Sequence, residues 1–234
     1  MSAPEIVVVG DVAGAAAERI AGAVRAGCHI ALSGGSTPRA AHERVAELAL
    51  DWSGVVLWFG DDRAVAPDHE HSNYAMARTS LLDRLEGPQP EVHRIEGELG
   101  YQQAAEAYEG ELRGSFGDGP PAIDLLLLGI GPDAHCASLF PGDAALGERE
   151  RWVVGVETPG MAPLVSRVTL TLPALNAARE VVFLISGEDK AEAVARAFAD
   201  APDPGAPASL VRPEPGALTV LLDAPAAARL EEGR

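Results

Sequence analysis

The sequence predicts an α/β fold, namely a doubly wound, mainly parallel sheet with helices on both faces. Short apolar stretches typical of buried strands alternate with helical patterns along the whole chain. The clearest strand is the unbroken apolar run from Leu125 to Leu128, which is followed by Gly129 and Gly131. A strand covered by helices on both faces needs apolar side chains on both sides, so this run favours a parallel sheet.

Each expected element rests on a local pattern. Short apolar runs predict strands at residues 6–9, 28–32, 55–59, 125–128, 152–156, 168–172, 181–185 and 218–222. Helices are expected at residues 12–25, 37–50, 72–85, 102–112, 189–198 and 224–230. The first helix places Ile20 and Val24 one turn apart and ends at Gly27. Ser72 is a candidate N-cap, and the Gly and Pro residues after Glu86 end that helix.

We expect residues 1–234 to form one α/β domain, because neither a repeat nor a change in composition indicates a linker. Two strand patterns follow each other in the stretch 150–172, as they do in an antiparallel pair. We expect this stretch to be a small excursion from the main sheet.

Composition restricts the classes of partner. The formal net charge of −17 argues against nucleic acid, whose phosphates would be repelled, although a local cluster of Arg and Lys still allows a small anionic substrate. No apolar run approaches a membrane span, and no basic N-terminal region indicates a secretory signal. The two cysteines do not resemble a disulfide scaffold. We therefore expect a cytoplasmic protein that is a monomer or a small homo-oligomer.

The first motif with a chemical role comes where a strand ends and a helix begins. It contains Ser33, Gly34, Gly35, Ser36 and Thr37. Two glycines allow the backbone to approach a ligand closely, and the free N–H groups at a helix N-terminus favour a phosphate. The segment lacks the Gly-Lys-Ser/Thr ending of a Walker A loop. An ordinary N-capped turn is the alternative interpretation.

Further polar residues follow two other expected strands. Asp61 and Arg63 come after the strand at 55–59, with Asn73 close behind, and Lys190 follows the strand at 181–185. Arg63 is suited to bind a phosphate through two hydrogen bonds, and a lysine in the first turn of a helix is explained by a phosphate partner. Arg167 is a weaker candidate of the same kind. The alternative for each is a solvated surface charge.

The central strand leads directly to Asp133 and His135. Ligands of open α/β sheets bind beyond the carboxyl ends of the strands, so an imidazole there, next to a carboxylate, is a candidate general base. A loop histidine in water is the alternative. The segment 129–134 also matches a dinucleotide fingerprint, but the prolines in and after it disfavour the long helix that should follow. A Cys136 thiol nucleophile and a zinc site are both disfavoured, because adjacent residues point apart and the other histidines lack ligand spacing.

Taken together, these segments resemble the 6-phosphogluconolactonases of the pentose phosphate pathway. The matching pieces are residues 33–38, 60–63 with 72–73, 129–142, 167–171 and 187–190, in that order along nearly the whole chain. The resemblance implies a fold similar to glucosamine-6-phosphate deaminases and ribose-5-phosphate isomerases. It implies no metal and no organic cofactor, and a catalytic base at the histidine of the Asp-x-His motif. The family most often has Gly, Thr and Glu where this chain has Ala134, Cys136 and Asp62.

The expected reaction is hydrolysis of 6-phosphoglucono-δ-lactone to 6-phosphogluconate. His135 activates water, Asp133 orients the imidazole, and backbone N–H groups of the 129–134 loop stabilise the oxyanion. The residues expected to bind the substrate are Ser33, Gly34, Gly35, Ser36, Thr37, Asp61, Arg63, Asn73, Gly131, Arg167 and Lys190. Two alternatives remain: an isomerase or deaminase of amino-sugar phosphates, and a non-catalytic regulator that binds sugar phosphates. The related deaminases have Asn-Glu-Pro where this chain has Leu139-Phe-Pro141, and Tyr in place of Arg63, which favours the lactonase.

Overall fold

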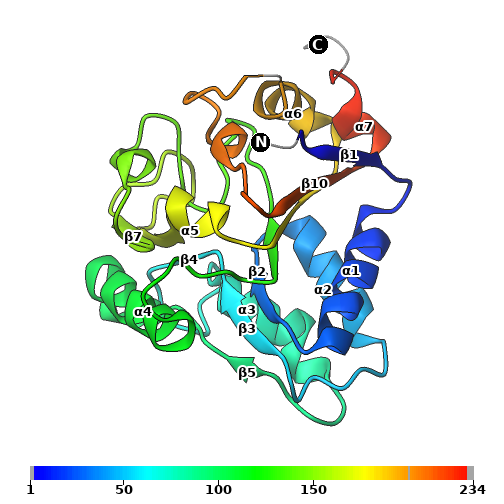
Figure 1. Cartoon of the computed structure of the whole chain (residues 1–234), viewed down its shortest axis with the longest axis vertical. Coiled ribbons are helices and arrows are strands. Elements are labelled where there is room, and N and C mark those ends of the chain that lie inside the picture. The colour runs from blue at the N-terminus through cyan, green and yellow to red at the C-terminus, as the bar shows by residue number, and fades with distance from the viewer. Residues whose placement is uncertain (1–2, 200, 231–234) are drawn as a thin grey trace.

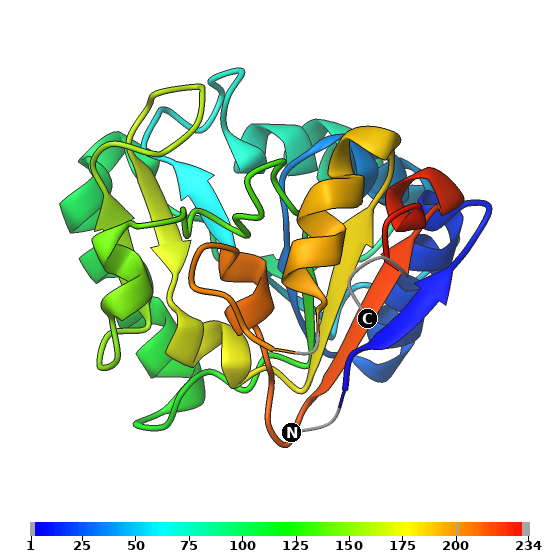
Figure 2. The ribbon, with the colours of Figure 1, turned by 90° about the horizontal axis from the view of Figure 1, so that it is seen from above.

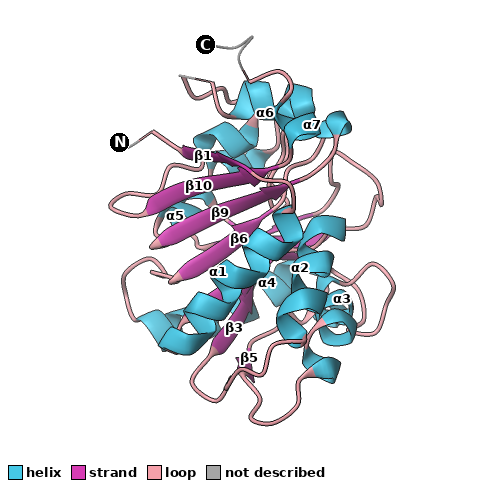
Figure 3. Cartoon of the chain, turned by 90° about the vertical axis from the view of Figure 1, so that its right-hand side faces the viewer, coloured by secondary structure: helices cyan, strands magenta, loops and turns pink. Residues whose placement is uncertain are grey.

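The computed structural model describes residues 3–199 and 201–230. Within this part of the chain, seven parallel strands form the main sheet, in the order β1-β10-β9-β6-β2-β3-β5 (Figures 1 and 3). These strands are β1 (Glu5–Val8), β2 (His29–Leu32), β3 (Val56–Phe59), β5 (Glu91–Val92), β6 (Leu125–Leu128), β9 (Glu180–Ile185) and β10 (Ala217–Leu222). The predicted mainly parallel sheet is confirmed.

Helices cover both faces of this sheet, because the central strands are apolar on both sides. All four side chains of β6 are buried. One face packs against α1 (Val12–Ala26) and α2 (Ser36–Ala46), and α3 (Asn73–Ser80) lies beside α2 (Figure 3). The other side carries α4 (Tyr101–Phe116) and α5 (Leu172–Asn176), as Figure 1 shows. After β9 comes α6 (Ala191–Ala197), on the side away from α1 (Figure 2), and α7 (Ala224–Ala227) follows β10.

A second sheet of three strands stands beside the main sheet. Its order is β4 (Asp61–Arg63), β8 (Arg167–Leu170) and β7 (Val153–Val156), and both pairings are antiparallel. The chain passes from one sheet to the other at Gly60, whose N–H donates to Leu32 and whose carbonyl accepts from Leu170. The strand patterns expected near 150–172 therefore pair antiparallel, as their spacing indicated. No strand was expected at residues 61–63, because three charged residues in a row are typical of a loop.

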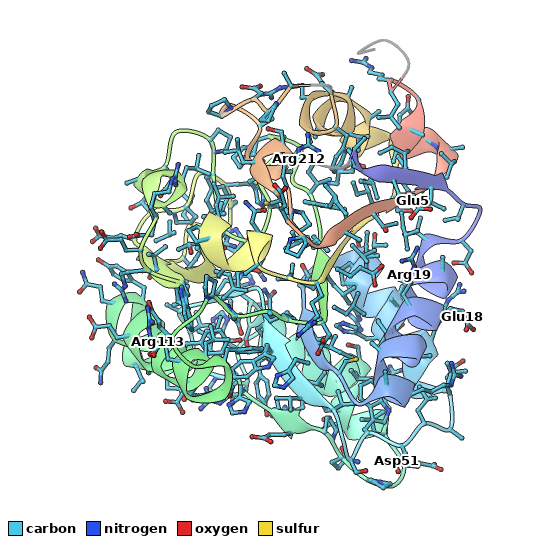
Figure 4. The ribbon with its side chains drawn as sticks, in the orientation of Figure 1. Glu5, Glu18, Arg19, Asp51, Arg113 and Arg212 are labelled. Carbon is cyan, nitrogen blue, oxygen red and sulfur yellow. The ribbon has the colours of Figure 1, made fainter. Side chains whose placement is uncertain are left out.

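Side chains of α4 attach the second sheet to the rest of the molecule. The guanidinium of Arg113, labelled in Figure 4, lies 4.1 Å from the ring centroid of Trp152. Glu109, which is buried, accepts hydrogen bonds from Arg113 (2.7 Å) and Arg151 (3.3 Å). The α4 helix is consequently joined to the two residues just before β7 by stacking and by a shared carboxylate.

Several helix boundaries differ from the expected ones. Gly27, with a φ of 66°, ends α1 as expected, and the Ser72 hydroxyl accepts from the Ala75 N–H at the start of α3. By contrast, α2, α3 and α7 end earlier than expected, α4 continues to Phe116, and α5 was not expected. The helix expected at 189–198 begins with a short 3₁₀ turn, Glu188–Lys190, so Lys190 precedes α6 rather than lying in its first turn. In the described ranges, no helix is long and apolar enough to cross a membrane.

One buried histidine fixes α2 against α3. His42 of α2 is fully buried, and its Nδ1 lies 3.2 Å from the Ser80 hydroxyl of α3. Ser80 gives its own proton to the Met76 carbonyl (2.7 Å), so the imidazole must be the donor, through Nδ1–H. Among the described residues, Nε2 has no hydrogen-bond partner. Burial lowers the pKa of His42 to about 4, so this imidazole is neutral at pH 7.

We therefore expect His42 to make the protein less stable in acid. The imidazole is neutral in the folded protein, whereas the unfolded chain takes up a proton as pH falls below about 6.5. The free energy of unfolding is therefore highest above about pH 6.5 and decreases as pH falls toward 4. Between pH 7 and pH 5 the decrease is about 2 kcal/mol. Urea titrations at pH 7 and pH 5 measure this loss of unfolding free energy. The loss should be smaller in His42→Gln than in wild type, whereas His69→Gln, at an exposed site, should lose as much as wild type. A His42→Gln variant with the wild-type pH dependence would contradict this assignment.

Candidate active site

The candidate site lies beyond the carboxyl ends of β3, β2, β6 and β9. The chain leaves the neighbouring strands β2 and β6 in opposite directions, from β2 to β3 and from β6 to β9. Ligands of open α/β sheets bind at such a position. A cavity of about 280 Å³ opens there. It brings together nearly all residues that the sequence analysis singled out: Ser33, Gly34, Gly35, Ser36, Thr37, Asp61, Arg63, Asn73, Gly131, His135, Arg167 and Lys190. Asp133 does not line the cavity but binds His135 from behind.

One wall is the turn from β2 into α2. The helix begins at Ser36, with Gly35 as its N-cap at a φ of 111°, a conformation that favours glycine. No side chain caps this N-terminus, and Ser36 and Thr37 both line the cavity. Gly34 must also be a glycine, because a Cβ there would lie 2.0 Å from Oδ1 of Asn73. The uncapped N–H groups and the helix dipole make this wall suitable for a phosphate.

Asn73 connects this wall to the second sheet. Its Oδ1 accepts from Nη1 of Arg63 (2.7 Å), and its Nδ2 donates to the Asp61 carbonyl (2.8 Å) and carboxylate (3.2 Å). Arg63 Nη1 also donates to the carbonyl of His71 (3.0 Å). Since the amide of Asn73 is 3% exposed and already bonded at both ends, its main role is to hold Arg63 and Asp61 in place.

Asp62, which the sequence analysis did not single out for any role, fixes the start of α3. It is 2% exposed and accepts from the backbone N–H groups of Arg63, Asn73 and Tyr74 and from the Ser72 hydroxyl. Burial raises the pKa of Asp62 to about 6, although the three backbone N–H groups lower it. Successive side chains of a strand point to opposite sides, and no strand was expected here. Asp61 therefore faces the cavity, whereas Asp62 faces the start of α3.

His135 and Asp133 form a close pair. Nδ1 of His135 lies 2.5 Å from Oδ1 of Asp133, which also accepts the His135 backbone N–H at 3.2 Å. Burial alone would raise the pKa of Asp133, but the hydrogen bond with His135 holds it below its usual value. An ionised carboxylate at Nδ1 favours the tautomer with the proton on that nitrogen. Nε2 is then the unprotonated nitrogen, and the imidazole ring lines the cavity.

Gly131 makes room for this imidazole rather than simply binding a ligand. A Cβ at Gly131 would lie 2.1 Å from Nδ1 of His135 and 2.6 Å from Oδ1 of Asp133. The Gly131 N–H donates to the His135 carbonyl (2.9 Å), and the Ala134 N–H donates to the Gly131 carbonyl (2.9 Å). These two N–H groups are therefore not available to an oxyanion, which corrects the expectation that the whole loop offers donors. Within the described chain, the N–H groups of Gly129 and Ile130 have no acceptor, and both residues line the cavity.

The departures at Ala134 and Cys136 have different consequences. Ala134 has a φ of 65°, a left-handed conformation that is costly for a residue with a Cβ and natural for glycine. Cys136 is 1% exposed and does not line the cavity, and burial raises the pKa of its thiol well above the usual range. A thiolate nucleophile at Cys136 is incompatible with both observations.

Lys190 lies in the 3₁₀ turn after β9 and lines the cavity, with Nζ 3.2 Å from the exposed Asp189 carboxylate. The turn is held by Asp223, which accepts from the Ser186 hydroxyl (2.5 Å) and the Gly187 N–H (3.1 Å) and also caps α7. Burial alone would raise the pKa of Asp223, but these donors keep it low. Asp223 and Ser186 thus position Lys190, a role that the sequence alone did not indicate.

Arg167 holds a wall of the cavity. The residue is 4% exposed, and its guanidinium donates to the carbonyls of Val165 (3.1 Å), Pro163 (3.1 Å) and Met161 (3.5 Å). Met161 also lines the cavity. Burial, followed by the charge of Arg63, lowers the pKa of Arg167. Arg167 is therefore mainly a support for the 161–165 loop and adds positive charge to the site.

The electrostatic character of the cavity differs from that of the whole chain. Arg63, Arg167 and Lys190 line it beside the N-terminus of α2, so it favours a small anion although the net charge is −17. Among the described residues, no three His, Cys, Asp or Glu side chains are grouped closely enough to hold a metal ion.

Comparison with known proteins gives the family. Residues 6–220 match the family model described as glucosamine-6-phosphate isomerases/6-phosphogluconolactonase. The chain belongs to this family. A 6-phosphogluconolactonase of Nostoc sp. is 42% identical over 207 residues, covering 86% of this chain and 84% of the relative. The human 6-phosphogluconolactonase is 48% identical over 176 residues, covering 74% of this chain and 67% of the relative.

Solved structures lead to the same family. The 6-phosphogluconolactonase from Trypanosoma cruzi superimposes with a TM-score of 0.86 at 30% identity, covering 98% of each chain. The resemblance inferred from the ordered motifs is thereby confirmed at the level of the family and the fold.

Gly131 offers a direct test of how the imidazole is placed. We expect Gly131→Ala to lower kcat by about 10²-fold, because the new Cβ displaces His135 from Asp133 and the loss of a general base costs rate on that scale. KM should change little, since the cations that line the cavity are untouched. Gly60→Ala is the matched control, because a Cβ there meets only ordinary contacts at 3.7 Å and beyond. Equal losses in both variants would indicate a general packing defect instead.

Proposed function

We propose that this protein hydrolyses 6-phosphoglucono-δ-lactone to 6-phosphogluconate, the lactonase step of the oxidative pentose phosphate pathway. The observation that carries the proposal is one cavity in which the Asp133–His135 pair faces a phosphate-binding wall. The family and the lactonase relatives support the same activity. A regulator that only binds sugar phosphates would have no use for an imidazole oriented by a carboxylate.

His135 acts as the general base. Asp133 holds the proton on Nδ1, so Nε2 takes a proton from a water molecule as that water attacks C1 of the lactone. The new C1–O bond creates a tetrahedral oxyanion, for which the N–H groups of Gly129 and Ile130 are the available donors in this loop. When the intermediate collapses, the bond between C1 and the ring oxygen breaks, and the protonated imidazole returns its proton to that oxygen.

The phosphate is bound away from the reacting ester. The N-terminus of α2, Arg63 and Lys190 supply N–H groups and positive charge at one end of the cavity. Binding energy from this remote group places C1 beside His135, which reduces the entropy cost of reaching the transition state. The δ-lactone is already reactive, so positioning and one general base are enough for useful acceleration.

We also propose a cell compartment, an oligomeric state and a partner for the enzyme. Cys28 and Cys136 are both free, which agrees with the reducing conditions of the cytoplasm, where we expect the enzyme to act. We expect a monomer or small homo-oligomer with a small sugar-phosphate lactone as its partner and no nucleic acid.

His135→Ala tests the base. We expect kcat for freshly generated lactone to fall by about 10²- to 10⁴-fold, the usual cost of losing a general base, with little change in the affinity for 6-phosphogluconate. Proton release at constant pH measures the rate, after subtraction of spontaneous hydrolysis. His69→Ala, which removes an exposed histidine, is the control. Near-normal kcat in His135→Ala would exclude His135 as the base.

Lys190→Ala and Arg63→Ala test the phosphate assignment. Each should raise KM for the phosphorylated lactone by about tenfold or more, as expected for a lost charge-assisted hydrogen bond, with a smaller effect on kcat. Hydrolysis of unphosphorylated glucono-δ-lactone should be nearly unchanged. Arg39→Ala, an exposed arginine on α2 that does not line the cavity, is the control. If both substrates suffered equally, these cations would not be binding the phosphate.

A further inference from the structure

Ser138 follows His135 by three residues but does not line the cavity. It is fully buried. Its hydroxyl donates to Oδ2 of Asp61 at 2.6 Å, and its backbone N–H donates to the Thr169 hydroxyl at 3.1 Å. Asp61 and Thr169 are cross-strand partners on β4 and β8. The loop that carries His135 is thus bonded twice to one position of the second sheet.

We propose that Ser138 is a positioning residue for substrate phosphate: its hydroxyl holds the Asp61 carboxylate and thereby keeps Arg63 directed into the cavity. This inference rests on the proposed function, because it assigns a partner to the phosphate-binding arginine. Ser138 itself does not line the cavity and therefore acts through Asp61.

A continuous chain of hydrogen bonds leads from Ser138 to Arg63. Ser138 bonds one oxygen of Asp61, and Nδ2 of Asn73 bonds the other at 3.2 Å. Oδ1 of Asn73 then accepts from Arg63 at 2.7 Å. Each member of this chain except Arg63 is at most 6% exposed, so water does not readily replace a lost partner.

The same chain reaches the phosphate-binding wall. Asn73 Oδ1 lies so close to Gly34 that a Cβ there would meet it at 2.0 Å. A shift of Asp61 that moves Asn73 therefore affects both Arg63 and the turn before α2. Ser138 consequently connects the loop of the catalytic base to the residues that bind phosphate.

Loss of the hydroxyl should redirect Arg63. Without the Ser138 hydroxyl, Oδ2 of the buried Asp61 loses its donor, and the strongest donors near the cavity are the guanidinium groups of Arg63 and Arg167. A carboxylate in this position attracts a guanidinium, and an arginine paired with Asp61 is less available to the substrate. A purely structural role would instead lower stability and reduce activity toward every substrate alike.

The experiment compares Ser138→Ala with wild type on two lactones. We expect KM for 6-phosphoglucono-δ-lactone to rise by about tenfold, a change on the scale of one unsatisfied buried acceptor, and kcat to change less than threefold. For unphosphorylated glucono-δ-lactone, kcat/KM should stay within about twofold of wild type. Ser209→Ala is the matched control, because this serine is equally buried but its hydroxyl bonds the backbone N–H and carbonyl of Asp203 and no carboxylate. If Ser138→Ala does not fold, Ser138→Cys removes the strong donor at nearly constant volume.

A double-mutant cycle tests the route through Arg63. In an Arg63→Ala background, Ser138→Ala should raise KM for the phosphorylated lactone by less than twofold. A full additional tenfold rise, or an equal loss on the unphosphorylated lactone, would overturn the proposal.

Calorimetry of 6-phosphogluconate binding needs no turnover, and weaker binding by Ser138→Ala than by wild type is expected. A wild-type protein without lactonase activity would refute the proposed function separately, while unchanged binding in Ser138→Ala would refute this inference.

Discussion

Two adjacent carboxylates, Asp61 and Asp62, are almost completely buried, and much of the architecture follows from the need to give them donors. A buried carboxylate is tolerated only with hydrogen bonds or a counter-charge. The start of α3 supplies donors to Asp62, and Asn73 and the loop after β6 supply donors to Asp61. Because the donors come from different parts of the chain, satisfying these two residues brings the second sheet, α3 and the loop that carries His135 together.

The main sheet and the elements that carry the site could be read from the sequence for a simple reason. Leu125–Leu128 is apolar on both sides, and the glycines after β2 and β6 indicate close approach of the backbone. Parallel strands end at one edge of a sheet, so residues following different strands meet there. That geometry brings Thr37, His135 and Lys190 to one cavity although they are far apart in sequence.

The second sheet and the roles of several site residues depend on long-range contacts, which local sequence patterns do not encode. The three residues of β4 form a strand by pairing with β8, which lies far along the chain, and the buried Asp61 finds a donor in the equally distant Ser138. Arg167 looks like a ligand for phosphate in sequence, yet three backbone carbonyls of the 161–165 loop occupy much of its guanidinium. Likewise, the role of Gly131 depends on where the His135 ring lies. Helix ends differ because caps and 3₁₀ turns are decided by local hydrogen bonds that propensity does not resolve.

The carboxylate of Asp133, which bonds the imidazole of His135, also has a consequence for the end of the proposed catalytic cycle. Before the reaction, the lactone carries no charge near His135, and Asp133 lies behind the imidazole at 2.5 Å. In the proposed reaction, ring opening creates a carboxylate beside this pair, so two carboxylates then lie near the same imidazole. Their repulsion acts only on the product. In the proposed reaction, Asp133 therefore favours departure of the product at the reacting end, while the contacts proposed for the phosphate are the same for substrate and product.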